Sequence, residues 1–100
     1  HMVQGHVDTV AQCVEKTDMH GSWKYGFTYS NLDYVTVPKG SVCVNGISLT
    51  VVNSKPGYFS VAIIPYTYEN TTIQFVEKEG FINVEFDILG KYFRAYMDQY

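Results

Sequence analysis

The residue types best suited to bind a small polar molecule lie in one short stretch, Lys39–Val52. Within it, Ser48 and Thr50 alternate with apolar side chains, which is the pattern of a strand with one apolar and one polar face. The two hydroxyls of such a strand lie about 7 Å apart. Hydroxyls on a rigid strand can orient a small polar ligand. For this stretch taken alone, a solvated outer face is the simpler interpretation.

A histidine close to the N-terminus is a candidate for proton transfer. His6 follows Gly5 at the start of an expected strand, from which its side chain can reach a ligand at the mouth of a barrel. An imidazole titrates near neutral pH and can therefore move a proton. A surface histidine without a role remains the alternative.

A third candidate segment, Ile64–Thr72, places a proline at the end of an apolar run and follows it with hydroxyl and aromatic side chains. Proline interrupts a strand, and backbone groups left without strand partners beside Pro65 can hydrogen-bond a flat heterocycle. A simple exit of the chain from the strand explains the same pattern.

Several kinds of active site are excluded. Ser48 lacks the flanking glycines of a nucleophile elbow, and no Ser-His-Asp triad can be argued. No acidic residue has metal-ligand spacing with a histidine, so we expect no metal. Asp87 alternates with apolar neighbours and is expected to be solvated. Cys13 and Cys43 are too few and too far apart for a zinc or redox pair, and we expect reduced core residues.

Length and composition fit one globular domain. The chain has 100 residues, of which 46% are hydrophobic and 17% charged, with a formal net charge of −3. It contains no basic run, which argues against nucleic-acid binding. No apolar stretch approaches the roughly 20 residues that cross a bilayer. There is no apolar leader, so we expect no membrane association and a cytoplasmic location.

Alternating patterns predict six strands and a closing helix. Asn45-Gly46 predicts a tight hairpin turn, and Pro56-Gly57 predicts a second turn. Many short strands with little helix favour an antiparallel barrel or sandwich, and a barrel removes exposed edges. Apolar residues at helical spacing predict a helix over 89–100. The predicted strands are His6–Val14, Trp23–Tyr29, Lys39–Val44, Ile47–Val52, Phe59–Ile64 and Phe81–Ile88.

Separated segments together resemble the lumazine-binding repeat of riboflavin synthases, and the resemblance covers nearly the whole chain. They include Val3-Gln4-Gly5-His6-Val7-Asp8, Lys39-Gly40-Ser41, Asn45-Gly46-Ile47-Ser48-Leu49-Thr50-Val51 and Ile63-Ile64-Pro65-Tyr66-Thr67. Several motifs in the same order are far more specific than any one of them.

The resemblance implies both a fold and a reaction. The family enzyme carries two repeats, each a six-stranded Greek-key barrel, and this chain (1–100) is similar to the second of them. In the implied reaction, two molecules of 6,7-dimethyl-8-ribityllumazine exchange a four-carbon unit. This yields riboflavin and 5-amino-6-ribitylaminouracil without a metal or organic cofactor. The implied assembly is a homo-oligomer, either a dimer of barrels or a trimer of the full chain.

The resemblance also implies roles for residues that match its motifs. His6 and Ser48 are the implied catalytic candidates, with His6 moving the proton. Thr67 is expected near the ribityl chain, and Lys39 would reach toward a neighbouring barrel. The implied substrate-binding set is Gly5, His6, Val7, Lys39, Ser48, Leu49, Thr50, Ala62, Ile63, Ile64, Pro65, Tyr66, Thr67 and Asp87.

The chain departs from the family pattern at four positions that bear on ligand contacts. Asn45 stands where many relatives carry Asp, Tyr66 and Tyr68 replace Glu and Leu, and Asn70 replaces Arg. These changes affect the expected ribityl contacts more than ring binding. Two other functions stay open: a non-catalytic lumazine or flavin carrier, and an interaction barrel without a ligand.

Overall fold

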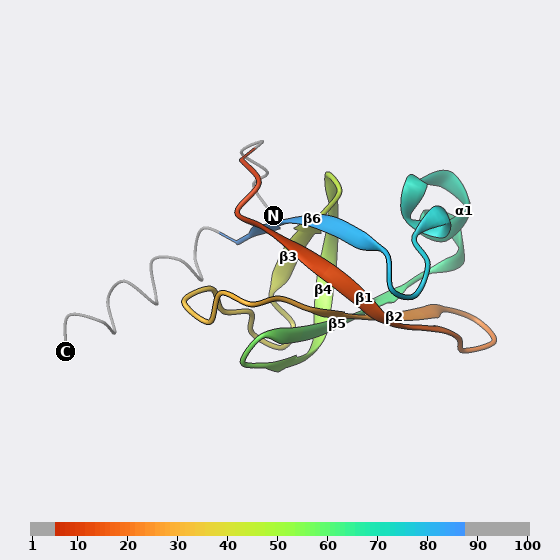
Figure 1. Cartoon of the computed structure of the whole chain (residues 1–100). Helices are drawn as coiled ribbons and strands as arrows, with labels where there is room; N and C mark the ends of the chain where they lie inside the picture. The colour runs from red at the N-terminus through yellow and green to blue at the C-terminus, as the bar shows by residue number, and fades with distance from the viewer. Residues whose placement is uncertain (1–5, 88–100) are drawn as a thin grey trace.

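A computed structural model describes residues 6–87 of the chain as a closed antiparallel barrel. The barrel strands run in the order β1-β2-β5-β4-β3-β6 and close between β6 and β1 (Figure 1). The strands are β1 (Thr9–Asp18), β2 (Trp23–Thr28), β3 (Ser41–Val44), β4 (Ile47–Lys55), β5 (Tyr58–Ile63) and β6 (Phe81–Phe86). The helices are α1 (Pro65–Asn70) and the 3-10 turn η1 (Thr72–Phe75).

The connectivity is that of a Greek key. Strands β3, β4 and β5 follow one another as hairpins, and β6 returns by a longer connection to lie beside β3. Because every one of the six strands has two neighbours, the barrel leaves no open sheet edge. The predicted six-stranded Greek-key barrel is therefore confirmed, whereas the predicted helix at 89–100 lies outside the described residues.

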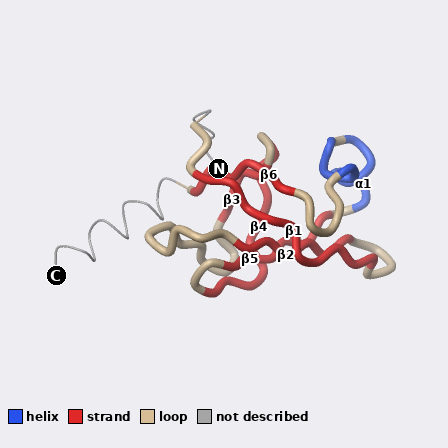
Figure 2. Tube along the Cα trace, in the orientation of Figure 1, coloured by secondary structure: helices blue, strands red, loops and turns tan. Residues whose placement is uncertain are grey.

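Both predicted hairpin turns are present. Asn45 has φ 47° and Gly46 has φ 83°, which is the pair of positive values that a two-residue hairpin turn requires. Gly57 follows Pro56 with φ 72° and joins β4 to β5. Figure 2 shows the six strands gathered together, with the short helix at one end.

The first strand differs from its prediction. Its predicted start at His6 is wrong, because β1 begins at Thr9 and continues to Asp18 in pairing with β2. Val7 precedes the strand, and its side chain is 58% exposed. A bulge between Cys13 and Glu15 shifts the register of β1 against β2. Local alternation in the sequence cannot reveal such a shift, because the partner strand determines it.

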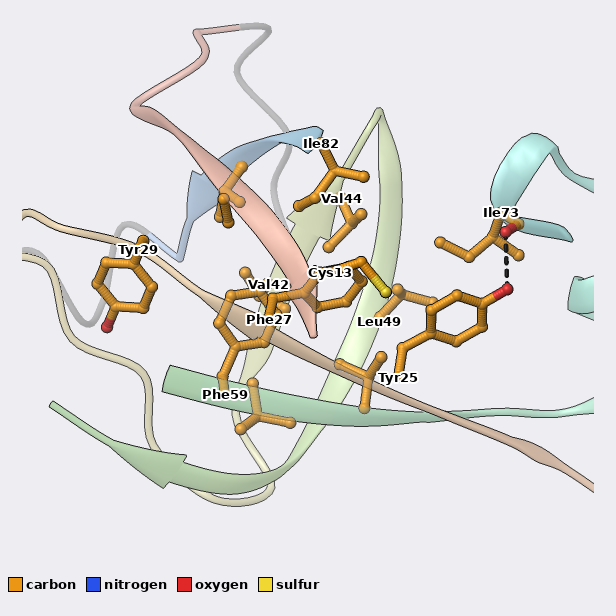
Figure 3. Packing of buried hydrophobic residues seen from close by; sticks show 14 of the residues in the cluster. Cys13, Tyr25, Phe27, Tyr29, Val42, Val44, Leu49, Phe59, Ile73 and Ile82 are labelled. Carbon is orange, nitrogen blue, oxygen red and sulfur yellow. Dashed lines mark hydrogen bonds between the residues drawn. The ribbon is translucent and has the colours of Figure 1, made fainter. Parts of the chain in front are cut away.

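The interior is filled by side chains from all six strands and from η1. The largest buried rings are those of Tyr25, Phe27 and Phe59, and Figure 3 shows them side by side across the barrel. The hydroxyl of Tyr25 donates to the Ile73 carbonyl at 2.9 Å, so its polar atom is satisfied inside the core. Burial raises the pKa of Tyr25 to about 12, so the phenol stays protonated at neutral pH.

Both cysteines are buried free thiols. Cys13 belongs to the hydrophobic core as predicted, whereas Cys43 is buried outside that cluster. Over residues 6–87, no helix has the length and apolar character to span a membrane.

The turn at Asn45 also ties the β3–β4 hairpin to β6, and this link is testable. Asn45 donates its backbone N–H to the Asn83 carbonyl at 2.9 Å, and its Oδ1 accepts from the Asn83 N–H at 2.8 Å. We expect Asn45→Ala to lower the free energy of unfolding by about 1–2 kcal/mol, through loss of that acceptor and strain at positive φ.

Asn45→Asp is the matched control, because aspartate keeps the acceptor and tolerates positive φ. It should stay within about 0.5 kcal/mol of the parent chain in urea unfolding. Equal losses in both variants would contradict the role assigned to the side-chain oxygen.

Candidate functional site

The two predicted hydroxyls lie on the outside of the barrel wall. Ser48 and Thr50 are exposed on β4, whereas Leu49 and Val51 beside them are buried in the core. The predicted alternation of this strand is confirmed. The site that these residues contribute to is therefore on the outer surface and not in the barrel mouth.

Strand pairing extends this outer face across three strands. Cys43 of β3 lies opposite both Ser48 of β4 and Glu85 of β6. Residues directly opposite one another in antiparallel pairs point to the same face. Glu85, Cys43 and Ser48 therefore form one outward row.

A second row runs parallel to the first, about 7 Å farther along the strands. Ser41 lies opposite Thr50, and its hydroxyl donates to Asp87 Oδ2 at 2.9 Å. Asp87 is half-buried and accepts this bond, so its carboxylate is only partly solvated. Its position in this row brings it next to the hydroxyl pair on β3 and β4.

The ladder between β4 and β5 stops while both strands continue. Its pairs run from Lys55 opposite Tyr58 to Val51 opposite Val61, and no β5 partner is paired with the earlier residues of β4. In Figure 1 the β3–β4 hairpin and the end of β5 diverge from this point. The wall of the barrel is thus parted at one place.

Backbone groups point into this parting. The Val51 N–H donates toward β3, to the Gly40 carbonyl at 2.8 Å. Because peptide groups of successive strand residues alternate between the two edges, those of Ser48 and Thr50 point toward β5. By the same alternation, the peptide groups of Ala62 point toward β4. Because Val51 bonds to the β3 side, its pairing with Val61 engages the flanking Thr50 carbonyl and Ala62 N–H. The peptide groups of Ser48 and the N–H of Thr50 are the β4 groups that point into the parting.

A surface depression of about 200 Å³ occupies this place. That volume is below the roughly 300–1,000 Å³ of a complete small-molecule pocket. Seven of the predicted site residues meet in it. They are Ser48, Leu49, Thr50, Ala62, Ile63, Ile64 and Thr67.

Pro65 ends β5 and begins α1. Ile64 is the helix N-cap, with an extended backbone and no side-chain capping bond, and its carbonyl accepts from the Tyr68 N–H at 3.0 Å. This carbonyl beside the proline, one of the groups expected to be open to a heterocycle, is thus used by the helix. Pro65 and Tyr66 are exposed and flank the depression without lining it.

His6 and Val7 lie in a second depression of about 190 Å³ on the same outer face. The His6 N–H donates to Glu85 Oε1 at 2.9 Å, so this segment covers β6. From β6 to β4 there are two strand spacings, about 10 Å. The structure therefore places His6 and Ser48 on one face but in separate depressions, with Cys43 between them.

The remaining predicted residues are more distant or not described. Lys39 has φ 68°, and its backbone N–H donates to the Val51 carbonyl at 2.8 Å, but its exposed side chain lines neither depression. Gly5 lies outside the described residues. Within residues 6–87, no three metal-ligating side chains gather.

Two residues of this face escaped the sequence analysis as site members. Glu85 is only 5% exposed because segment 6–8 covers it, and Ser41 holds Asp87. In the sequence, Glu85 alternates with the apolar Phe86, which predicts an outward side chain for Glu85. Its burial depends on segment 6–8, which is distant in the sequence and cannot be read from the local pattern.

Cys43 lies between Glu85 and Ser48 in the outward row and lines the depression that contains His6. Its surroundings favour the neutral thiol. Burial raises the pKa of its thiol, and the nearby Glu85 carboxylate raises it further, while a backbone hydrogen bond at Gly46 lowers it. The thiol is therefore protonated at neutral pH and is a poor nucleophile.

The sequence matches the family described as the lumazine binding domain over residues 4–87. It is 37% identical over 98 residues to the riboflavin synthase of Actinobacillus pleuropneumoniae, covering 97% of this chain and 46% of that protein. It is 35% identical over 97 residues to the riboflavin synthase of Saccharomyces cerevisiae, covering 91% and 41%. The chain thus spans about half the length of the curated relatives it matches.

The raised thiol pKa values give a test of this face. Burial raises the pKa of Cys13 as well, so thiolate forms at both cysteines only at higher pH than in an exposed thiol. We expect neither cysteine to react with Ellman's reagent within minutes at pH 8 in the folded protein, and both to react fully in denaturant. Rapid reaction of one thiol in the folded protein would show that Cys43 or Cys13 is open to solvent.

Proposed function

Because this chain belongs to the lumazine binding domain family, we propose that it is one barrel of a riboflavin synthase. The length of the match to its relatives supports a single repeat, with residues 1–100 forming one of two domains. Its similarity to the second repeat, seen in the Gly5-His6 and Asn45–Ser48 motifs, supports the C-terminal half. The ligand is 6,7-dimethyl-8-ribityllumazine, and riboflavin is the product.

The parting between β4 and β5 is the observation that carries this proposal. The pyrimidine half of a lumazine presents N–H and carbonyl groups along one edge. The peptide groups of Ser48 and the N–H of Thr50 point into the parting and offer such an edge both donors and acceptors. Leu49 and Ile63 add apolar contact for the flat ring. Because backbone groups recognise the ring in this scheme, the identity of the neighbouring side chains matters less for ring binding.

The reaction requires two lumazines face to face, and one barrel offers one shallow depression. Bringing the two rings together in a fixed geometry supplies much of the acceleration. A second barrel must therefore cover the first, which supports a homo-oligomer, either a dimer of barrels or a trimer of a longer chain. Within this scheme, His6 moves the proton and Ser48 makes a polar contact to the ring.

The same scheme includes a cytoplasmic location and no nucleic-acid or membrane partner. The formal net charge of −3 supports a small-molecule ligand over a nucleic acid.

A second candidate function is binding without turnover. It is favoured by the separation of His6 from Ser48, because a ring held over Ser48 and Ala62 does not lie in the same depression as the imidazole. A lumazine or flavin carrier would use the same parting in the barrel wall. The two functions differ only in whether product forms.

Ligand binding is tested by titrating the protein with riboflavin and following the quenching of flavin fluorescence. We expect saturable quenching, and we expect Ala62→Trp to raise the Kd at least about tenfold because the new ring fills the depression. Val52→Trp is the matched control, since Val52 lies on β4, is 48% exposed and does not line the depression.

The control variant should bind riboflavin with the affinity of the parent chain. If Ala62→Trp binds as tightly as Val52→Trp, the ligand does not sit in the parting. If the parent chain binds neither riboflavin nor the lumazine, the interaction barrel without a ligand is the better description.

Turnover separates the enzyme from the carrier. We expect this 100-residue barrel to form riboflavin weakly or not at all, and a chain with both repeats to be active, because only two barrels pair two rings. In the two-repeat chain, His6→Ala should lower kcat by about 100-fold, the range of a general acid–base contribution. Robust turnover by the isolated barrel would overturn the half-enzyme proposal, and tight binding without product in the longer chain would favour the carrier.

A further inference from the structure

The helix that carries Thr67 has little to hold it in place by itself. α1 has six residues, no side-chain cap at Ile64, no acidic residue in its first turn and no buried residue. Isolated helices shorter than about 12–15 residues are marginal in water. Because Thr67 lines the Ser48–Ala62 depression, contacts outside the helix must fix its place there.

A stacked ring pair supplies the first of these contacts. Tyr68 is half-buried and its ring lies on that of Trp23, with centroids 4.5 Å apart and an interplanar angle of 6°. Trp23 begins β2 and is paired with Ile63 of β5, which lines the depression. The stack therefore attaches α1 to the barrel directly beside the parting.

A half-buried lysine supplies the second contact. Lys16 Nζ lies 5.5 Å from the centroid of the Trp23 ring and 5.6 Å from that of Tyr68, within the range of cation–π attraction. It also donates to the Gln74 carbonyl at 2.9 Å and to Glu77 Oε1 at 2.8 Å. One side chain of β1 thus contacts the stack and the segment that follows α1.

The environment of Lys16 keeps this group charged. Its side chain is half-buried and 10% exposed, and this partial burial lowers the pKa of the ammonium. The hydrogen bond to Glu77 and the neighbouring Tyr25 and Tyr68 outweigh that effect and raise the pKa overall. The cation is therefore present at every pH at which the barrel would bind its ligand.

Short hydrogen bonds within α1 brace the turn that contains both Thr67 and Tyr68. The Thr71 hydroxyl donates to the Thr67 carbonyl at 2.7 Å, and the Asn70 amide donates to the Tyr66 carbonyl at 2.8 Å. The turn is thereby stiff, so a displacement of Tyr68 moves Thr67 with it.

We propose that Lys16, Trp23 and Tyr68 are positioning residues that hold Thr67 against the ligand depression and so set the affinity for the ribityl-bearing ligand. This inference rests on the proposed function for the identity of the ligand. None of the three residues lines the depression itself, so their effect on the ligand is transmitted through α1.

The test compares two stacked tyrosines by riboflavin titration. Tyr34 is also half-buried and stacks on Phe86 at 4.9 Å and 3°, and it does not line the depression. We expect Tyr68→Leu to raise the riboflavin Kd about tenfold and Tyr34→Leu to change it less than about twofold, although both lower the melting temperature.

A second pair of variants removes charge without removing a ring. Lys16→Met should raise the Kd about tenfold, whereas Lys55→Met, which removes an exposed ammonium 5.8 Å from the Tyr58 ring, should leave it within about twofold. If Tyr68→Leu does not fold, this pair decides the question. Tyr68→Phe keeps the stack and should restore the parent affinity.

Two further readouts separate positioning from a general loss of stability. Emission of Trp23, the only tryptophan, should shift to the red in Tyr68→Leu and stay unchanged in Tyr34→Leu. Lumiflavin, which has the flavin ring with a methyl group in place of the ribityl chain, should bind the parent chain and Tyr68→Leu alike. Equal weakening of riboflavin binding by both leucine variants, or none by Tyr68→Leu and Lys16→Met, would overturn the proposal.

Failure of the proposed function has a different signature. If the parent chain binds no riboflavin, the ligand assignment falls, and amide exchange decides the positioning claim alone. The Tyr68 N–H, which donates to Ile64, should then exchange faster in Lys16→Met than in Lys55→Met. Equal exchange in the two variants would show that Lys16 does not hold the helix.

Discussion

The feature on which the site depends is the early end of the β4–β5 ladder. A closed barrel normally satisfies every inner backbone group with a neighbouring strand. Here pairing stops at Val51 and Val61 while both strands continue, so the peptide groups of Ser48 and the N–H of Thr50 face a shallow depression. The same closure that stabilises the barrel keeps this parting rigid, because β4 remains paired to β3 and β5 to β2.

Two features keep the parting from closing. Pro65 lacks an N–H and turns the chain from β5 into α1, so β5 cannot extend along β4. On the other side, the Asn45-Gly46 turn ends the β3–β4 hairpin and is bonded to β6. The helix then lies beside the depression, where the Trp23–Tyr68 stack holds it. Chain direction and ring packing thus combine to expose backbone groups at one place.

Much of this was predictable because it is local. The alternation around Ser48, the Asn45-Gly46 turn and the strand-ending Pro65 are readable within a few residues. The burial of Glu85, the bond from Ser41 to Asp87 and the separation of His6 from Ser48 were not, since each depends on β6 lying beside β3. The late start of β1 at Thr9 also depends on a distant segment, because residues 6–8 cover β6 before the strand begins.

The central claim is that backbone groups in the parting bind the heterocycle. Amide hydrogen exchange of Ser48 and Thr50, with and without saturating riboflavin, tests it most directly, with Leu49 as the internal reference because its amide faces β3. The account predicts fast exchange at Ser48 and Thr50 in the free protein and strong protection in the complex, with Leu49 slow in both. Exchange at Ser48 and Thr50 that stays the same when riboflavin is bound would contradict it.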